Sequence, residues 1–180
     1  MVVPYALAQV LIVPIVSAPI VYLAGRRMGK QTGWIAALPL VYTLLLIASV
    51  AVEIDGGGAY REDYVWAPAA GLSFGMLADG LSIWMLLTIN ILCLMICVYS
   101  ISYMEHRFHE EEHETGVHVS NSAYASYYAL YLLYAVGMLG TVMATNLIQF
   151  YLFYELMLVP SWALINNYGY GERERIGMMY

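Results

Sequence analysis

The chain has very little charge for its length. Of its 180 residues, 11% are Asp, Glu, Lys or Arg, 62% are hydrophobic, and the mean hydropathy is +0.68. A soluble domain carries about 25% charged residues. The composition therefore excludes a water-soluble globular protein and indicates an integral membrane protein. Nothing in the sequence indicates a nucleic-acid-binding site, and we expect no such partner.

The sequence also has few cysteines, and no basic residue precedes its first apolar run. The two cysteines, Cys93 and Cys97, lie four residues apart in an apolar stretch. We expect them to be reduced, because a disulfide along one helical turn has poor geometry. The first basic residue, Arg26, follows the first apolar run, whereas a signal peptide carries its positive charge before the run. The first run is therefore predicted to be a retained helix.

Apolar segments long enough to cross a membrane recur along the chain. A spanning helix needs about 20 predominantly apolar residues. We predict an all-α membrane protein, a bundle of five transmembrane helices with the start of a sixth from about Arg175. The predicted spans are residues 5–23, 34–52, 81–100, 123–144 and 146–166.

The basic residues predict the orientation of these spans, because cytoplasmic loops are enriched in Lys and Arg. Six of the seven fall on one side of the predicted bundle and Arg61 alone falls on the other. We therefore predict a multi-pass protein of the plasma membrane with its N-terminus outside. The six are Arg26, Arg27, Lys30, Arg107, Arg173 and Arg175.

The predicted external segment, residues 53–80, contains a pattern typical of strands. Leu72, Phe74 and Met76 alternate with Ser73 and Gly75, the period of a half-buried strand. The segment 64–66, Tyr-Val-Trp, is a candidate partner strand. We predict a short external β-hairpin that covers helix ends or contacts a neighbouring subunit.

Glu155 is the candidate functional residue. It is the only ionisable group other than tyrosine in the span 146–166 and lies near its middle. An acid at the centre of a membrane helix costs roughly 2.5–3.5 kcal/mol on insertion scales, so it usually marks a proton or ion pathway. Pro160 also removes the hydrogen bond to the Leu156 carbonyl, which leaves a polar group beside the acid. The alternative is a structural acid that is neutral or paired with a neighbouring helix.

Milder polar patterns follow two other spans. Tyrosines at 124, 127, 128, 131 and 134 share one helical face, and Asn90, Cys93, Cys97 and Ser100 form a similar stripe. Such groups serve either as hydrogen bonds between helices or as a hydrated path. Gly137 and Gly140 are small residues that allow close approach of a neighbouring helix.

The segment His109–His113 matches the zinc-protease pattern HExxH, with Glu110 as the general base. It lies in a predicted cytoplasmic connector that contains five acids, where the pattern arises easily by coincidence. His106 and His118 are the nearest further candidates for a third ligand. We predict a solvated charged segment, no bound metal and no protease activity.

Two segments resemble the antiporter-like subunits of respiratory complex I, specifically the subunit M type. One is 78–82, Ala-Asp-Gly-Leu-Ser, continued by 99–104, and the other is 150–160, which reads FYLFYELMLVP. The resemblance implies that the chain is the N-terminal transmembrane part of a fold of about fourteen helices, built from inverted repeats. The resemblance also implies that Glu155 is the proton-transfer residue. In that family, lysines on later helices partner the corresponding glutamate.

The resemblance also implies the function. We expect a non-redox, proton-translocating subunit of a complex I-like quinone oxidoreductase, without a cofactor and with the quinone site in another subunit. Expected partners are the L-like and N-like membrane subunits, protons and the bilayer. The alternatives are a subunit of a cation/proton antiporter or a membrane-bound hydrogenase, and a structural membrane scaffold.

Overall fold

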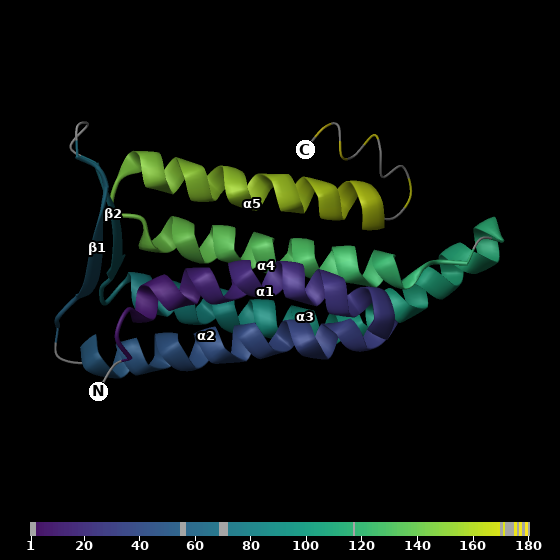
Figure 1. Cartoon of the computed structure of the whole chain (residues 1–180), viewed down its shortest axis with the longest axis horizontal. Coiled ribbons are helices and arrows are strands. Elements are labelled where there is room, and N and C mark those ends of the chain that lie inside the picture. Colours follow the sequence, from purple (N-terminus) through teal and green to yellow (C-terminus); the bar gives the residue numbers. More distant parts are fainter. Residues whose placement is uncertain are drawn as a thin grey trace.

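The computed structural model describes residues 3–54, 57–68, 72–116 and 118–169, together with 171, 175, 177 and 179. Within them the chain forms a bundle of long, roughly parallel or antiparallel helices with a two-stranded sheet across one end (Figure 1). The elements are α1 (Ala6–Met28), η1 (Gly29–Gln31), α2 (Thr32–Ile54), β1 (Tyr60–Ala67), β2 (Leu72–Ala78), α3 (Ser82–Thr115), α4 (Asn121–Met143) and α5 (Leu147–Tyr168).

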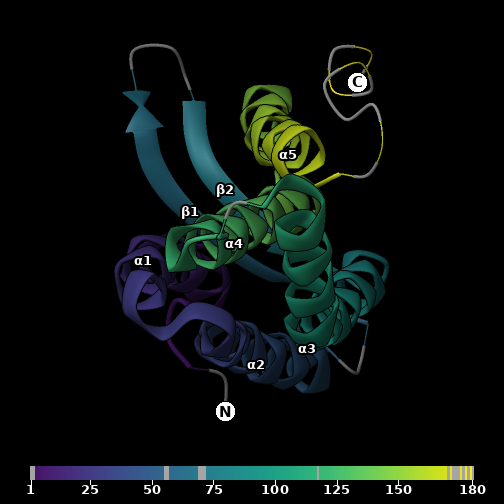
Figure 2. The same cartoon turned by 90° about the vertical axis from the view of Figure 1, so that its right-hand side faces the viewer.

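The number of separate spans differs from the prediction. By length and composition four helical runs in the described part of the chain can cross a membrane, and the first is one run of 49 residues, Ala6–Ile54. It contains both of the first two predicted spans as α1 and α2, which lie side by side (Figures 1 and 2). Between them lies only the short 3-10 helix η1, so almost no loop separates the two helices. The chain reverses at Gly29, whose φ of 57° suits glycine, and continues directly into the short 3-10 turn.

The charged segment after the third predicted span is also helical. We predicted that the span ends near Ser100, but α3 continues to Thr115 and is 34 residues long in all. At about 1.5 Å per residue it is roughly 50 Å long and extends beyond the bundle (Figure 1). No Gly or Pro interrupts the sequence until Gly116, which ends the helix in the left-handed conformation. The charged segment is therefore the exposed end of a helix and not a connector loop.

The predicted β-hairpin is confirmed. β1 and β2 pair antiparallel, with Tyr64 opposite Phe74 and Glu62 opposite Met76, and the register shifts between Val65 and Ala67. The Met76 side chain is buried in the core that α1 to α4 share. The hairpin therefore covers one end of the bundle with the apolar face that the alternation predicts.

Glu62 of β1 caps the first helix from a distance in the sequence. The backbone N–H groups of Leu7 and Ala8 donate to its two carboxylate oxygens, both at 3.0 Å. The Tyr64 hydroxyl donates to the same carboxylate at 3.0 Å. Burial and the nearby Glu62 raise the pKa of Tyr64 to about 12, so the hydroxyl stays protonated as a donor. A carboxylate at this place satisfies free N–H groups at the positive end of α1.

We expect Glu62→Ala to destabilise the fold by about 1–3 kcal/mol, because two helix-end donors and a tyrosine lose a charged acceptor. The measurement is unfolding of purified protein in detergent by titration with a denaturing surfactant. The matched control is Asp63→Ala, which removes an exposed acid on the same strand that pairs with Arg61. Equal loss of stability in both variants would contradict the capping role.

The helix α4 is central to the bundle. It packs against α1 on one side and α5 on the other, while α2 and α3 complete the group (Figure 2). The close approach predicted at Gly137 and Gly140 is confirmed. A Cβ built on Gly137 would lie 2.6 Å from the backbone nitrogen of Met157 on α5, and one on Gly140 would overlap the ring of Phe153. Glycine is therefore required where α5 docks.

The predicted start of a sixth helix lies largely outside the described residues. Between 170 and 180 the structure describes only Gly171, Arg175, Gly177 and Met179.

Candidate proton-transfer site

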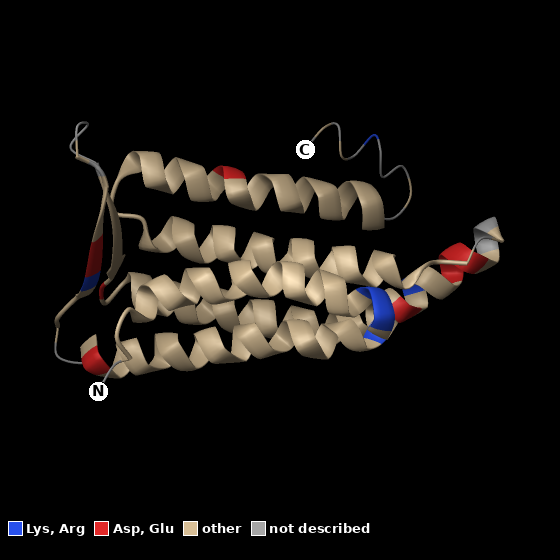
Figure 3. Ribbon diagram, viewed as in Figure 1, with Lys and Arg blue, Asp and Glu red and all other residues tan. Residues whose placement is uncertain are grey.

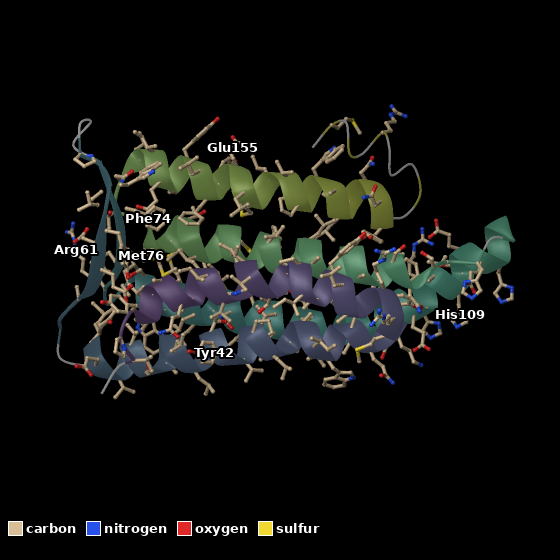
Figure 4. All side chains as sticks on the ribbon, viewed as in Figure 1. Tyr42, Arg61, Phe74, Met76, His109 and Glu155 are labelled. Carbon is tan, nitrogen blue, oxygen red and sulfur yellow. The ribbon has the colours of Figure 1, made fainter. Side chains whose placement is uncertain are left out.

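Glu155 lies near the middle of α5, on the side that points away from the rest of the bundle (Figure 4). The side chains of α5 that are buried against its neighbours include Gln149, Phe153 and Pro160. Glu155 follows Phe153 by two positions, which is about 200° around the helix. The carboxylate therefore occupies the open face of α5 and is half-exposed.

The open face of α5 is otherwise apolar and aromatic. Tyr151 lies one turn before Glu155, and its hydroxyl interacts with the carboxylate. The other exposed side chains on this side of α5 include Ile148, Leu152, Val159 and Trp162. The result is one carboxylate, with one hydroxyl beside it, in the middle of an apolar helical stripe.

The backbone next to Glu155 contains a free acceptor. Pro160 lies inside α5 and has no N–H, so the carbonyl of Leu156 lacks the intrahelical donor it would normally receive. Helix continues through Pro160, and the Ser161 hydroxyl donates to the Leu158 carbonyl at 2.9 Å. A carboxylate and a carbonyl in adjacent residues can both accept hydrogen bonds from water or from a partner group.

Charged groups are concentrated at the two ends of the bundle, with Glu155 between them (Figure 3). At one end lie Arg26, Arg27, Lys30 and Arg107, and at the other lie Glu62 and the Arg61–Asp63 pair on the hairpin. At the first of these ends Lys30 on η1 pairs with Glu105 on α3 at 2.6 Å. Glu155 is therefore separated from both charged ends by apolar helix.

The polar groups of α3 and α4 meet as contacts between helices. The Tyr131 hydroxyl donates to the Cys93 carbonyl at 2.8 Å, and Ser100 contacts the Tyr128 hydroxyl at 3.4 Å. These bonds agree with the interpretation that the stripes connect helices. Sequence reasoning missed Thr43 of α2, whose hydroxyl accepts a bond from Asn90 at 2.7 Å. A single threonine in an apolar span gave no signal of this contact.

The HExxH histidines lie on the part of α3 that extends beyond the bundle (Figure 4). His109 is 66% exposed, and its ring nitrogen lies 3.8 Å from the Glu112 carboxylate. That carboxylate also accepts a bond from the Val119 N–H at 2.7 Å, which fixes the turn between α3 and α4. Among the residues that the structure describes, no group of three His, Cys, Asp or Glu side chains is placed to hold a metal ion. The absence of a metal stays a prediction.

The segment 78–82 has a structural role at the start of α3. The Asp79 carboxylate accepts from the N–H groups of Leu81 and Ser82, at 3.1 and 2.8 Å, and from the Ser82 hydroxyl at 2.8 Å. These bonds from Ser82 lower the pKa of Asp79. The motif is therefore a helix cap.

Comparison with known proteins agrees with this architecture. A family model described as NADH-Ubiquinone oxidoreductase (complex I), chain 5 N-terminus, matches residues 66–112. A Na(+)/H(+) antiporter subunit of Alkalihalophilus pseudofirmus is 29% identical over 160 residues, which cover 88% of this chain and 18% of that protein. NAD(P)H-quinone oxidoreductase chain 5 of Synechocystis sp. is 27% identical over 172 residues, covering 89% and 23% respectively.

Solved structures share the fold. The Mrp complex from Dietzia sp. matches with a TM-score of 0.74 at 24% identity, over 96% of this chain and 17% of that one. Respiratory complex I from Thermus thermophilus matches with a TM-score of 0.70 at 23% identity, over 96% and 31%. The chain spans about a fifth of the length of the curated relatives it matches.

The fold and these matches define the class: the described part of the chain has four helical runs that can cross a membrane, and its fold is shared with parts of the Mrp complex and of respiratory complex I. It is homologous to a subunit of Na(+)/H(+) antiporters and to chain 5 of NAD(P)H-quinone oxidoreductases, which confirms the resemblance to the antiporter-like subunits of complex I. The narrower assignment to subunit M stays a prediction, because the matching quinone oxidoreductase proteins are named chain 5 or subunit 5.

Proposed function

We propose that the chain forms the N-terminal part of a proton-translocating subunit in a complex I-like quinone oxidoreductase, with Glu155 as a proton-transfer residue. The observation that carries the proposal is the position of Glu155 in the middle of α5 on its open face. The fourteen-helix subunit, the L-like and N-like partners and the distant quinone site belong to the same proposal. No cofactor is assigned to this chain.

The energetic reason is the cost of a carboxylate in lipid. An acid at the centre of a membrane helix is costly, and intramembrane acids generally face a protein interior or a water-filled cavity. The described helices leave the Glu155 face of α5 uncovered. We therefore infer that protein outside this segment covers it, so that the carboxylate meets polar groups or water. The nearby Tyr151 hydroxyl and the free Leu156 carbonyl would hold such water beside Glu155.

A second function has an observation in its favour. The antiporter relative matches 88% of the chain, much as the quinone oxidoreductase relative does, so exchange of a cation for protons is the alternative. The driving reaction separates the two candidates. The experiment follows proton movement in membrane vesicles that contain the assembled complex, started either by an electron donor with quinone or by a sodium gradient. Movement driven by quinone reduction supports the first function, and movement driven only by sodium supports the second.

The orientation is part of the proposal and has its own test. With the N-terminus outside, a cysteine introduced at Gly58 should react with an impermeant thiol reagent that is added to intact cells. Cysteines at Met28 and Gly116 should react only after the membrane is opened. Met28 and Gly58 are exposed in the structure, so poor labelling reflects the side of the membrane and not burial. The reverse pattern would contradict the orientation, because it depends on the distribution of Lys and Arg.

A further inference from the structure

The outer face of α1 carries an exposed apolar stripe that ends at two arginines. Ile12, Val16, Ile20 and Leu23 are all exposed and follow one side of the helix. Arg27 continues this stripe and Arg26 stands beside it, both in the last turn of α1. No described helix covers these side chains, because α1 packs against α2 and α4 with its other faces.

The two arginines lack a counter-charge within the described part of the chain. Their neighbours at the same end are paired: Lys30 contacts Glu105 at 2.6 Å, and Arg107 lies 3.9 Å from Glu111. For Arg26 and Arg27 the structure gives no ion pair with any described acid, and both are exposed. The blue end of α1 in Figure 3 marks this charge. No described acid balances this charge, so the two guanidinium groups can bind an anionic group.

The arginines and the stripe meet at a hollow. The described residues that line it are Ile20, Leu23, Ala24, Arg26 and Arg27, all on α1, so the hollow is open towards the surroundings of the helix. Ile20 is 57% exposed and Leu23 is 64% exposed, although both are apolar. The hollow is therefore cationic at the helix end and apolar along the membrane-spanning part of α1.

We propose that this hollow binds an anionic phospholipid. The guanidinium groups of Arg26 and Arg27 hold its phosphate, and one acyl chain lies along Leu23, Ile20 and Val16. Guanidinium groups bind phosphate oxygens in bidentate fashion, and basic residues at the membrane boundary attract anionic headgroups.

The length of the apolar stripe agrees with the thickness of one leaflet of the bilayer. From Val16 to Arg27 the helix rises about 16 Å at 1.5 Å per residue, which is about half of the ~30 Å hydrocarbon core. An acyl chain attached to a headgroup at Arg27 would therefore follow the stripe to the bilayer centre. A zwitterionic lipid fits less well, because its cationic headgroup would add positive charge beside two arginines. Free phosphate would leave the apolar side chains without a partner.

The test uses the purified full-length protein in lipid nanodiscs of phosphatidylcholine with increasing phosphatidylglycerol. Phosphatidylglycerol that remains bound to the protein is counted by native mass spectrometry. We expect Arg26→Gln to weaken retention about fivefold and the Arg26→Gln, Arg27→Gln double variant about thirtyfold. The matched control is Arg61→Gln, which removes one exposed basic charge at the opposite end of the bundle and should retain the lipid.

Two further measurements separate loss of lipid binding from misfolding and from simple phosphate binding. The Arg26→Lys, Arg27→Lys variant preserves charge, so it should fold as the natural protein does and lose only the bidentate part of the affinity. Millimolar inorganic phosphate should not displace the lipid. Displacement by phosphate, equal retention of phosphatidylcholine, or unchanged retention in the double glutamine variant would each overturn the proposal.

Discussion

Glu155→Gln is expected to remove most proton translocation from the assembled complex while the complex still forms. Glutamine keeps the length of the side chain and its capacity to accept a hydrogen bond, but it does not titrate. Insertion of α5 should be equal or slightly better, because a neutral amide avoids the cost of a charge in the membrane. Quinone reduction should slow with proton transfer, since the two are coupled. The measurements are proton uptake by vesicles, the rate of quinone reduction and the recovery of assembled complex.

Two further variants distinguish proton transfer from a structural role. Glu155→Asp still titrates but withdraws the carboxyl by one methylene, and a misplacement near 1 Å costs on the order of a hundredfold, so part of the activity should remain. Tyr151→Phe removes the neighbouring hydroxyl without touching the acid and should have a smaller effect. A scaffold role predicts that Glu155→Gln is silent or prevents assembly, according to whether a charged partner stays unpaired. Normal coupled pumping in an assembled Glu155→Gln complex would falsify the assignment.

Gly137→Ala is expected to weaken the docking of α5 on α4. The added Cβ would lie 2.6 Å from the Met157 nitrogen and 2.7 Å from its Cα, and neither backbone atom can rotate away. The two helices must then separate, which should cost about 1–3 kcal/mol as overpacking does. Helix propensity alone predicts the opposite sign, since Ala is favoured over Gly in a helix by about 1 kcal/mol. The sign of the change in unfolding free energy therefore decides between the two effects.

The measurement is surfactant-induced unfolding in detergent, with Gly80→Ala as the matched control because nothing lies within 4 Å of a Cβ built there. The control should change stability by less than about 0.5 kcal/mol. A stabilised Gly137→Ala variant would show that α4 and α5 do not approach as closely as the structure has them. Because Glu155 lies on α5, Gly137→Ala should also lower proton translocation without altering the acid itself.

Several features were predicted from local sequence because their causes are local. The alternation at Leu72–Met76 indicated a strand with one apolar face, and β2 has Met76 in the core. The small residues at Gly137 and Gly140 indicated a helix contact, and α5 docks there. The helical continuation of α3 to Thr115 was missed, because the high charge of the segment suggested a loop. A high charge, however, indicates that a segment is exposed to solvent and does not by itself end a helix.

The sequence by itself determined that this is a membrane protein, where its apolar segments lie, which end of each is basic, and that Glu155 is an isolated acid among apolar residues. These properties follow from composition and order along the chain. Only the tertiary structure decided which faces meet. It placed the Glu62 carboxylate at the N-terminus of α1, 55 residues away, turned Glu155 to the open face of α5, and left Arg26 and Arg27 beside an uncovered apolar stripe. Contacts between distant residues depend on how helices pack around α4, and no local pattern encodes that choice.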